Sequence, residues 1–403
     1  MTTTTTTPRL DSVLPWSALL ALGTAVFITS LTETLPAGVL PELASTLAIS
    51  SGEAGQSVTV YAAGTALTAI PLVTATQRVP RKVLLLSALL AFTVANTLTA
   101  LAPNYPVLLV SRVLAGVAAG LAWALLAGYA RRIAPAGQEG RALALAMAGI
   151  PLALSLGVPV GTLLGQQLGW RAVFGAISAL TLAVAAWTLA KVPAVGAPAP
   201  QHTDEKATAG RTLRVPGMVA IMTVVVTFVL GHTIIYAYVA PYLHHARLAS
   251  SVDVILLAFG AACLVSIWFT GRHIDTHLRG LTLLSATLFT AAIAAFALTT
   301  AVEVVWIGAV VWGLAWGGVP TLLQTTAGQV GSRHSAAVAD TAQAILVTLW
   351  NVAMAAGGVV GGLLLQGVAV TAVPTAAAAL GAVSLLVIAT ARRHVITYAT
   401  QAP

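Results

Sequence analysis

Two charged side chains, Glu33 and Arg112, stand within long apolar runs of the sequence, at 15–38 and 106–129. An ionisable group inside a membrane costs about 2.5 to 3.5 kcal/mol or more, so it normally faces a partner or a water-filled cavity. At 1.5 Å per helical residue, the two groups lie at similar depth. A carboxyl group there could load and release a proton, and its protonation would release a paired arginine. The alternatives are a structural hydrogen bond for Glu33, and a fixed ion pair or a snorkelling side chain for Arg112.

The sequence contains an internal repeat whose copies lie half a chain apart. Leu156–Gln166 reads LGVPVGTLLGQ and Ala356–Gln366 reads AGGVVGGLLLQ, with six of eleven positions identical. A repeat at this offset predicts two homologous halves. Its small residues and proline predict thin, flexible helix faces along which one half packs against the other. These residues are Gly149, Gly157, Pro159, Gly161, Gly357 and Gly361.

A third candidate for handling protons comes from the same repeat. His232 occupies the position in the second half that Glu33 occupies in the first. Histidine titrates near neutral pH, so this side chain could carry a proton. The alternative is a hydrogen-bonded packing residue within an apolar helix.

The composition indicates that most of the chain lies in lipid. Of its 403 residues 58% are hydrophobic and only 7% are charged, whereas soluble proteins are about 25% charged. Apolar runs of about 20 residues without strand-like alternation predict transmembrane helices rather than a barrel. The predicted fold class is an all-α membrane protein with twelve transmembrane helices in two pseudo-symmetric six-helix bundles. The predicted spans are 15–38, 55–75, 83–102, 106–129, 140–164, 170–191, 216–241, 252–271, 281–300, 303–325, 337–365 and 371–391.

Charge, cysteine content and motifs argue against other classes of protein. The lone Cys263 cannot form an intramolecular disulfide, and its apolar neighbours indicate a packing residue. The net charge of +8 is scattered through short loops, which argues against nucleic-acid binding. The sequence has no H-E-x-x-H, G-x-S-x-G or phosphate-loop motif, so we expect no enzyme activity, no metal site and no cofactor.

Basic residues and one composition shift divide the chain into parts. Most basic residues fall in alternate loops, and only Arg171 and Arg247 fall in the intervening ones, so the positive-inside rule places both termini in the cytoplasm. A polar stretch rich in proline and alanine separates the halves. The predicted parts are a disordered cytoplasmic tail at 1–14, a six-helix bundle at 15–192, a cytoplasmic linker at 193–215, a second six-helix bundle at 216–391 and a cytoplasmic tail at 392–403.

Four passages resemble the major facilitator superfamily. They are TETLPAGVLPELASTLAIS at 32–50, SRVLAGVAAG at 111–120, GIPLALSLGVPVG at 149–161, and Asn351 followed closely by AMAAGGVVGG. The chain is most similar to the twelve-helix drug:proton antiporter group, in the branch of bacterial sugar, purine and chloramphenicol exporters. This resemblance implies a transporter of the cell membrane that works by alternating access. It also implies proton-coupling roles for a carboxylate in the first helix, here Glu33, and an arginine in the fourth, here Arg112.

One loop departs from the pattern G-x-x-x-D-x-x-x-R that this family usually has after its second helix. The second half keeps the pattern from Gly271 through Asp275 to Arg279. The first half has Val73 and Gln77 in place of the glycine and the aspartate. The role of that aspartate in the family's gate is therefore in question for the first half.

The charges at the cytoplasmic ends of the two halves differ in sign. Arg141 and Asp340 occupy equivalent repeat positions. We hypothesise that the basic first-half loop meets Asp340 and that Asp275 meets Arg141, which would latch the gate in the outward-facing state. The alternative is a set of solvated loop charges worth about 0 to 1 kcal/mol per pair. The gate candidates are Arg78, Arg81, Arg141, Asp275, Arg279 and Asp340.

Polar and aromatic groups in the central spans are candidates for a substrate cavity. Drug-sized ligands favour apolar walls with a few polar groups. For each aromatic residue the alternative is packing against lipid or at its interface. The candidates are Tyr61, Tyr236, Tyr238, Trp316, Gln343, Trp350 and Asn351.

These observations and the resemblance predict a monomeric, proton-coupled exporter of small amphipathic drug- or antibiotic-like molecules. Its expected partners are a small-molecule substrate, protons and the lipid bilayer, and the proton gradient is its energy source. Efflux of sugars, purines or nucleosides and uncoupled facilitation are the alternatives. Sugars need many hydrogen bonds in their site, and the central spans hold few amides and carboxylates, which favours drug-like substrates.

Overall fold

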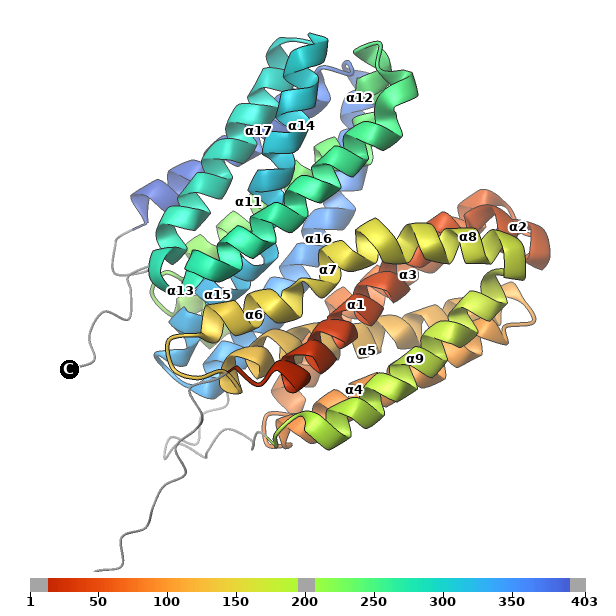
Figure 1. The fold of residues 1–403 in the computed structure, drawn as a ribbon, viewed down its shortest axis with the longest axis vertical. Helices are drawn as coiled ribbons and strands as arrows, with labels where there is room; N and C mark the ends of the chain where they lie inside the picture. Colours follow the sequence, from red (N-terminus) through yellow and green to blue (C-terminus); the bar gives the residue numbers. More distant parts are fainter. Residues whose placement is uncertain (1–13, 195–206, 392–403) are drawn as a thin grey trace, which may run out of the picture.

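The computed structural model describes residues 14–194 and 207–391, and within these the chain is helical with no strands. Residues 1–13 and 392–403 of the predicted tails and residues 195–206 of the predicted linker lie outside the described residues. The helices form two bundles that stand side by side (Figure 1). The fold class predicted from the sequence is confirmed.

The first bundle contains the following elements in chain order: α1 (Trp16–Gly38), α2 (Leu40–Leu47), α3 (Ser51–Ala75), α4 (Arg81–Ala100), α5 (Tyr105–Arg132), α6 (Glu139–Met147), α7 (Gly149–Leu152), the π-helical turn η1 (Ala153–Gly157), α8 (Val158–Leu168) and α9 (Trp170–Lys191). The second bundle follows a short helix, α10 (Ala209–Arg214). It contains α11 (Met218–Ala237), α12 (Val239–His245), the short turn η2 (Ala249–Ser251), α13 (Val252–Leu298), α14 (Val302–Trp316), α15 (Val319–Ser332), α16 (Ala336–Gly367) and α17 (Ala372–Thr390).

Ten continuous helical segments among the described residues are long and apolar enough to cross a membrane. One of them, α13, contains two of the predicted spans. They are separated at His277, where the backbone leaves helical geometry. Another predicted span, 140–164, is divided among α6, α7, η1 and α8 and is too interrupted to count as one segment. Pro159 lies in this span and cannot donate a backbone hydrogen bond, which is consistent with the irregular turn that precedes it. Together these segments account for twelve spans.

The glycine-rich faces pack within each bundle rather than between bundles. A Cβ atom at Gly149 would overlap the carbonyl of Gly23 in α1, and one at Gly161 would meet Leu35 of the same helix. In the second bundle a Cβ at Gly357 would lie 2.6 Å from the Cβ of Thr233 in α11. The expectation that these glycines pack one half against the other is therefore wrong. Their lack of side chains lets the repeated helices approach their neighbours in the same half.

The two bundles touch through a different set of helices. α16 packs against α3 and α5, and α13 packs against α6. The helix ends that carry Arg81, Arg132, Glu139 and Asp340 come together there, and we call this region the basic end. Figure 1 shows the bundles adjacent at α6 and α15 and diverging toward α2 and α12. Each bundle has its own large cluster of buried apolar side chains.

Candidate functional site

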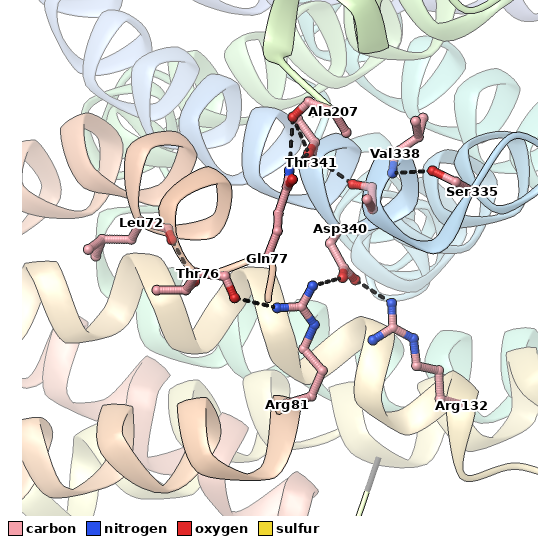
Figure 2. Close-up of polar contacts among 11 residues, drawn as sticks. Leu72, Thr76, Gln77, Arg81, Arg132, Ala207, Ser335, Val338, Asp340 and Thr341 are labelled. Atoms are coloured by element: carbon pink, nitrogen blue, oxygen red, sulfur yellow. Dashed lines mark hydrogen bonds and ion pairs between the residues drawn. The ribbon is translucent and has the colours of Figure 1, made fainter. Parts of the chain in front are cut away.

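A buried aspartate joins the two bundles at the basic end (Figure 2). Asp340 Oδ2 lies 2.5 Å from Arg81 Nη2, and its Oδ1 lies 2.7 Å from Arg132 Nη2. The side chains of Asp340 and Arg81 are only 3% and 1% exposed, whereas that of Arg132 is 23% exposed. Charge-assisted hydrogen bonds in such dry surroundings are strong but depend on every partner being present.

Local sequence explains how these three charges meet. Ser335 caps the start of α16 by accepting the backbone N–H of Val338, which fixes the helical turn that carries Asp340. Arg81 is the first residue of α4, and Arg132 is the last residue of α5. Arg81 also donates to the carbonyl of Thr76 at 3.3 Å, so its guanidinium is held on two sides.

The hypothesis that the first-half loop meets Asp340 identified one of its two partners. Arg81 is that partner, whereas Arg78 is exposed and Lys82 donates to the carbonyl of Leu189. Sequence reasoning missed Arg132, because its contact with Asp340 depends on how α5 and α16 pack across the two bundles. The signal available was a pair of basic residues, Arg131 and Arg132, just beyond the end of the predicted span 106–129.

The second predicted contact takes a different form. Asp275 accepts the backbone N–H groups of Gly140 at 2.5 Å and Arg141 at 3.0 Å, at the start of α6. Asp275 therefore meets Arg141 as hypothesised, but through the backbone N–H of Arg141, because the N-terminal amides of a helix favour negative charge. Asp275 lies in the connection between two spans, and burial raises the pKa of its carboxyl although these N–H groups act in the opposite direction. Arg279 donates to the carbonyls of Ile388 and Ala389 within its own bundle.

Gln77 has a donor role that an aspartate could not fulfil. Its Nε2 donates to the carbonyl oxygen of Ala207 at 2.9 Å and approaches the hydroxyl of Thr341 at 3.4 Å (Figure 2). The Thr341 hydroxyl also lies 3.3 Å from the same carbonyl. An ionised carboxylate only accepts hydrogen bonds, so the departure from the family pattern lets this loop bind the segment that leads into α10.

Replacing Gln77 by glutamate tests this donor role with almost no change of shape. We expect the substitution to lower the free energy of unfolding by about 1 to 3 kcal/mol, because two oxygen atoms would face each other where a donor met a carbonyl. Thermal unfolding of the purified protein measures the effect. Gln167→Glu, at an exposed position of α8, is the matched control. Equal stabilities of the two variants would contradict the donor role.

A cavity of about 220 Å³ lies beside Asp340 at the basic end. Arg131 of α5 reaches across it to Gly328 of α15, where any Cβ would overlap its guanidinium. Its Nε atom is buried without a hydrogen-bond partner. The remaining charged lining residues are Arg132, Glu139 and Asp340. Arg131 therefore fills space between the bundles without a hydrogen bond at its Nε, and sequence reasoning did not single it out.

Arg112 is completely buried in the first bundle and has no ion-pair partner among the residues that the structure describes. It donates to the carbonyls of Thr32 at 2.7 Å and Ser57 at 3.4 Å, and its guanidinium lies 4.8 Å from the centre of the Tyr61 ring. Its Nη1 atom has no partner. Complete burial excludes a side chain that snorkels to the interface.

Glu33 lies near Arg112 but is not bonded to it. Its half-buried carboxylate lies beside the side chain of Trp123. Within the described residues, every ion pair shorter than 4.0 Å involves Asp340. The expected direct Glu33–Arg112 pair is therefore wrong, because backbone carbonyls and aromatic rings surround the guanidinium instead.

Only some of the predicted cavity residues lie together. Tyr236, Trp316 and Trp350 form one aromatic cluster with His232. Tyr61 lies instead in the first bundle, under Arg112. The other candidates make contacts within the second bundle: the Tyr238 hydroxyl donates to the carbonyl of Gly358, Gln343 Nε2 to that of Gln324, and Asn351 Nδ2 to that of Val347.

The described part of the chain contains no cluster of three or more side chains suited to hold a metal ion. The candidate site consists of buried charged side chains where the two helical bundles meet. Two apolar helical bundles that are joined by charged contacts at one end are the architecture of a membrane transport protein.

The family is established by comparison with known proteins. The model of the Major Facilitator Superfamily matches residues 22–340, and the chain belongs to this family of transporters. It is 31% identical over 375 residues to a chloramphenicol efflux pump of Mycobacterium tuberculosis, which occurs in strains CDC 1551 / Oshkosh and ATCC 25618 / H37Rv. That alignment covers 90% of this chain and 89% of the relative.

Solved structures share the fold at low sequence identity. The proton:xylose symporter XylE aligns with a TM-score of 0.75 at 17% identity, covering 93% of this chain and 94% of XylE. The human organic anion transporter MFSD10 aligns with a TM-score of 0.68 at 15% identity, covering 95% of this chain and all of that one. The resemblance inferred from the four sequence passages is thus confirmed at the level of the family.

Proposed function

We propose that this transporter is a proton-coupled exporter of small amphipathic molecules, with chloramphenicol as the reference substrate. The observation that carries the export direction is the 31% identity to a chloramphenicol efflux pump over nine-tenths of the chain. In the proposed orientation the basic end faces the cytoplasm, in keeping with the positive-inside rule. Both termini then lie on the cytoplasmic side of the inner membrane.

The proposal for alternating access rests on contacts at the basic end. Asp340 holds α4 and α5 against α16, while Asp275 holds the start of α6 against the connection in α13. In the proposed cycle these contacts form when the cytoplasmic side closes and break when substrate enters from the cytoplasm. Charged contacts suit such a switch because water replaces them once the surfaces separate.

Proton coupling is assigned to Glu33, with Arg112 as a positively charged neighbour. Glu33 is a half-buried carboxylate within an apolar helix. Because a charge in this location costs free energy, such residues usually mark functional sites. The charge of Arg112 favours the ionised carboxylate even without direct contact. Loading a proton on Glu33 would remove this attraction and change the balance between the two states of the transporter.

Glu33→Gln tests the proposed coupling. We expect cells producing this variant to lose chloramphenicol resistance to the level of cells without the transporter, because glutamine cannot release a proton. The measurement is export of labelled chloramphenicol with and without collapse of the proton gradient. Glu303→Gln, at an exposed position near the start of α14, should export as the wild type does.

Two results would overturn parts of the proposal. Export that is unaffected both by Glu33→Gln and by collapse of the gradient would identify an uncoupled facilitator. Export of a sugar, purine or nucleoside in place of chloramphenicol would overturn the substrate assignment and leave the coupling test intact.

A further inference from the structure

Aromatic rings from four helices form one continuous cluster in the second bundle. Its centre is the imidazole of His232 in α11, which is stacked on the ring of Trp316 in α14 with centroids 3.4 Å apart and planes 3° from parallel. Tyr236, one turn along α11, lies nearly parallel to the same imidazole at 5.4 Å. Trp350 of α16 extends the cluster, with its centroid 5.6 Å from that of Trp316. Phe259 of α13 closes it from another side.

A hydrogen bond fixes the central imidazole in one form. Trp312 Nε1–H donates to His232 Nδ1 at 3.1 Å. Because an indole nitrogen can only donate, this Nδ1 must be an acceptor, and the imidazole is neutral with its proton on Nε2. The imidazole of His232 is therefore a flat, neutral ring that is held in one fixed orientation.

One end of the cluster lies close to a contact between the two bundles. Thr348 of α16 donates to the carbonyl of Ala66 in α3 at 3.0 Å, which joins the bundles at that level. Trp350 follows two residues later and is partly exposed. Tyr236 is 42% exposed, so ring surface is accessible at both Trp350 and Tyr236.

We propose that this cluster is a subsite for a planar aromatic ring of the substrate and that His232 is a positioning residue for Trp316. The proposal deepens the proposed export function and rests on it. Aromatic faces prefer other aromatic rings over saturated rings of the same size, because the negative face of one ring attracts the positive edge of another. A rigid stack also presents its surface without first losing side-chain freedom.

The expected substrates are accordingly molecules with a flat aromatic group at one end and a polar group at the other. The second bundle would bind the ring. The polar end would extend toward the first bundle, where the half-buried carboxylate of Glu33 lies beside Trp123. Saturated analogues are expected to be weaker ligands.

The experiment compares two ligands of the same length on the purified, full-length protein. One is chloramphenicol, which carries a 4-nitrophenyl ring, and the other is an analogue with a 4-nitrocyclohexyl group in its place. Isothermal titration measures both Kd values. We expect the aromatic ligand to bind about 3- to 10-fold more tightly, and Trp316→Leu to reduce this ratio to about one.

Three further variants separate ring positioning from general damage. His232→Phe keeps a flat ring and should retain the preference for the aromatic ligand. His232→Asn keeps a hydrogen-bond acceptor but no stacking ring, and it should lose the preference. Trp268→Leu removes a tryptophan that is 66% exposed on α13 and should change neither Kd.

Binding and export report on separate claims. Equal Kd values for the two ligands, or no measurable binding of chloramphenicol by the wild type, would overturn the aromatic subsite. Retained selectivity in Trp316→Leu would overturn it as well. Selective binding without any export from cells would overturn the proposed export function and leave the subsite standing.

Discussion

Asp340→Asn is expected to abolish export and to lower the free energy of unfolding by about 3 to 5 kcal/mol. The substitution keeps the shape of the side chain but removes its charge. Arg81, only 1% exposed, would then be a buried cation with no counter-charge within ion-pair distance among the described residues. The closed arrangement at the basic end should lose population, because the guanidinium can regain water only if α4 and α16 separate.

Two measurements check this prediction. Thermal unfolding reports the loss of stability, and the reactivity of a cysteine introduced at Ala336 reports access to the cavity at the basic end, in a background where Cys263 is replaced by alanine. Arg132→Gln is the control, and we expect it to have a smaller effect than Asp340→Asn. The Arg132 side chain is 23% exposed, so this site can be solvated without separating the helices. The double variant Arg81→Asp with Asp340→Arg should recover part of the export. Full export by Asp340→Asn would show that this contact is not part of a gate.

Arg112→Met is expected to abolish export without the loss of stability that we expect for Asp340→Asn. Arg112 is a buried charge with no ion pair, and its Nη1 atom has no hydrogen-bond partner. Replacement of a buried charge by an apolar side chain of similar volume is often neutral or stabilising by about 1 to 4 kcal/mol. We therefore expect an unchanged or higher unfolding temperature together with loss of chloramphenicol export.

The contrast between the two variants is the informative result. The Ser57 carbonyl in α3 retains its helical hydrogen bond when the guanidinium is removed, whereas the Thr32 carbonyl in α1 faces Pro36, which has no N–H. The loss of this donor offsets part of the gain in stability. Methionine also fills most of the space beside Tyr61. A large loss of stability with export retained would mean that Arg112 serves to hold α1, α3 and α5 together.

Much of the architecture could be predicted from the sequence, because a membrane span is a local property. Twenty consecutive apolar residues cross the hydrocarbon whatever their neighbours are, so the spans and the fold class were correctly predicted. The break at His277 also lies within the loop predicted between 271 and 281. Arg81 was correctly identified among the candidates for Asp340, since opposite charges at the same end of two repeated halves have few other partners.

The incorrect expectations share one cause. Glu33 and Arg112 were placed at the same depth, but depth does not give the direction in which each side chain points around its helix. The glycine faces were correctly assigned to close helix packing but to the wrong neighbours, since a thin face fits any adjacent helix. Asp275 meets backbone amides because α6 begins there, a fact that depends on where the helix starts in space.

The sequence by itself determined that this chain is a two-part, all-helical membrane protein and which charged residues lie in or beside lipid. Hydrophobic burial and backbone hydrogen bonding require no knowledge of distant contacts. Only the tertiary structure decided the partners: Arg132 for Asp340, Ala207 for Gln77, and an aromatic stack for His232. These pairs join segments far apart in the chain, and their choice depends on helix rotation and on which faces two bundles present to each other.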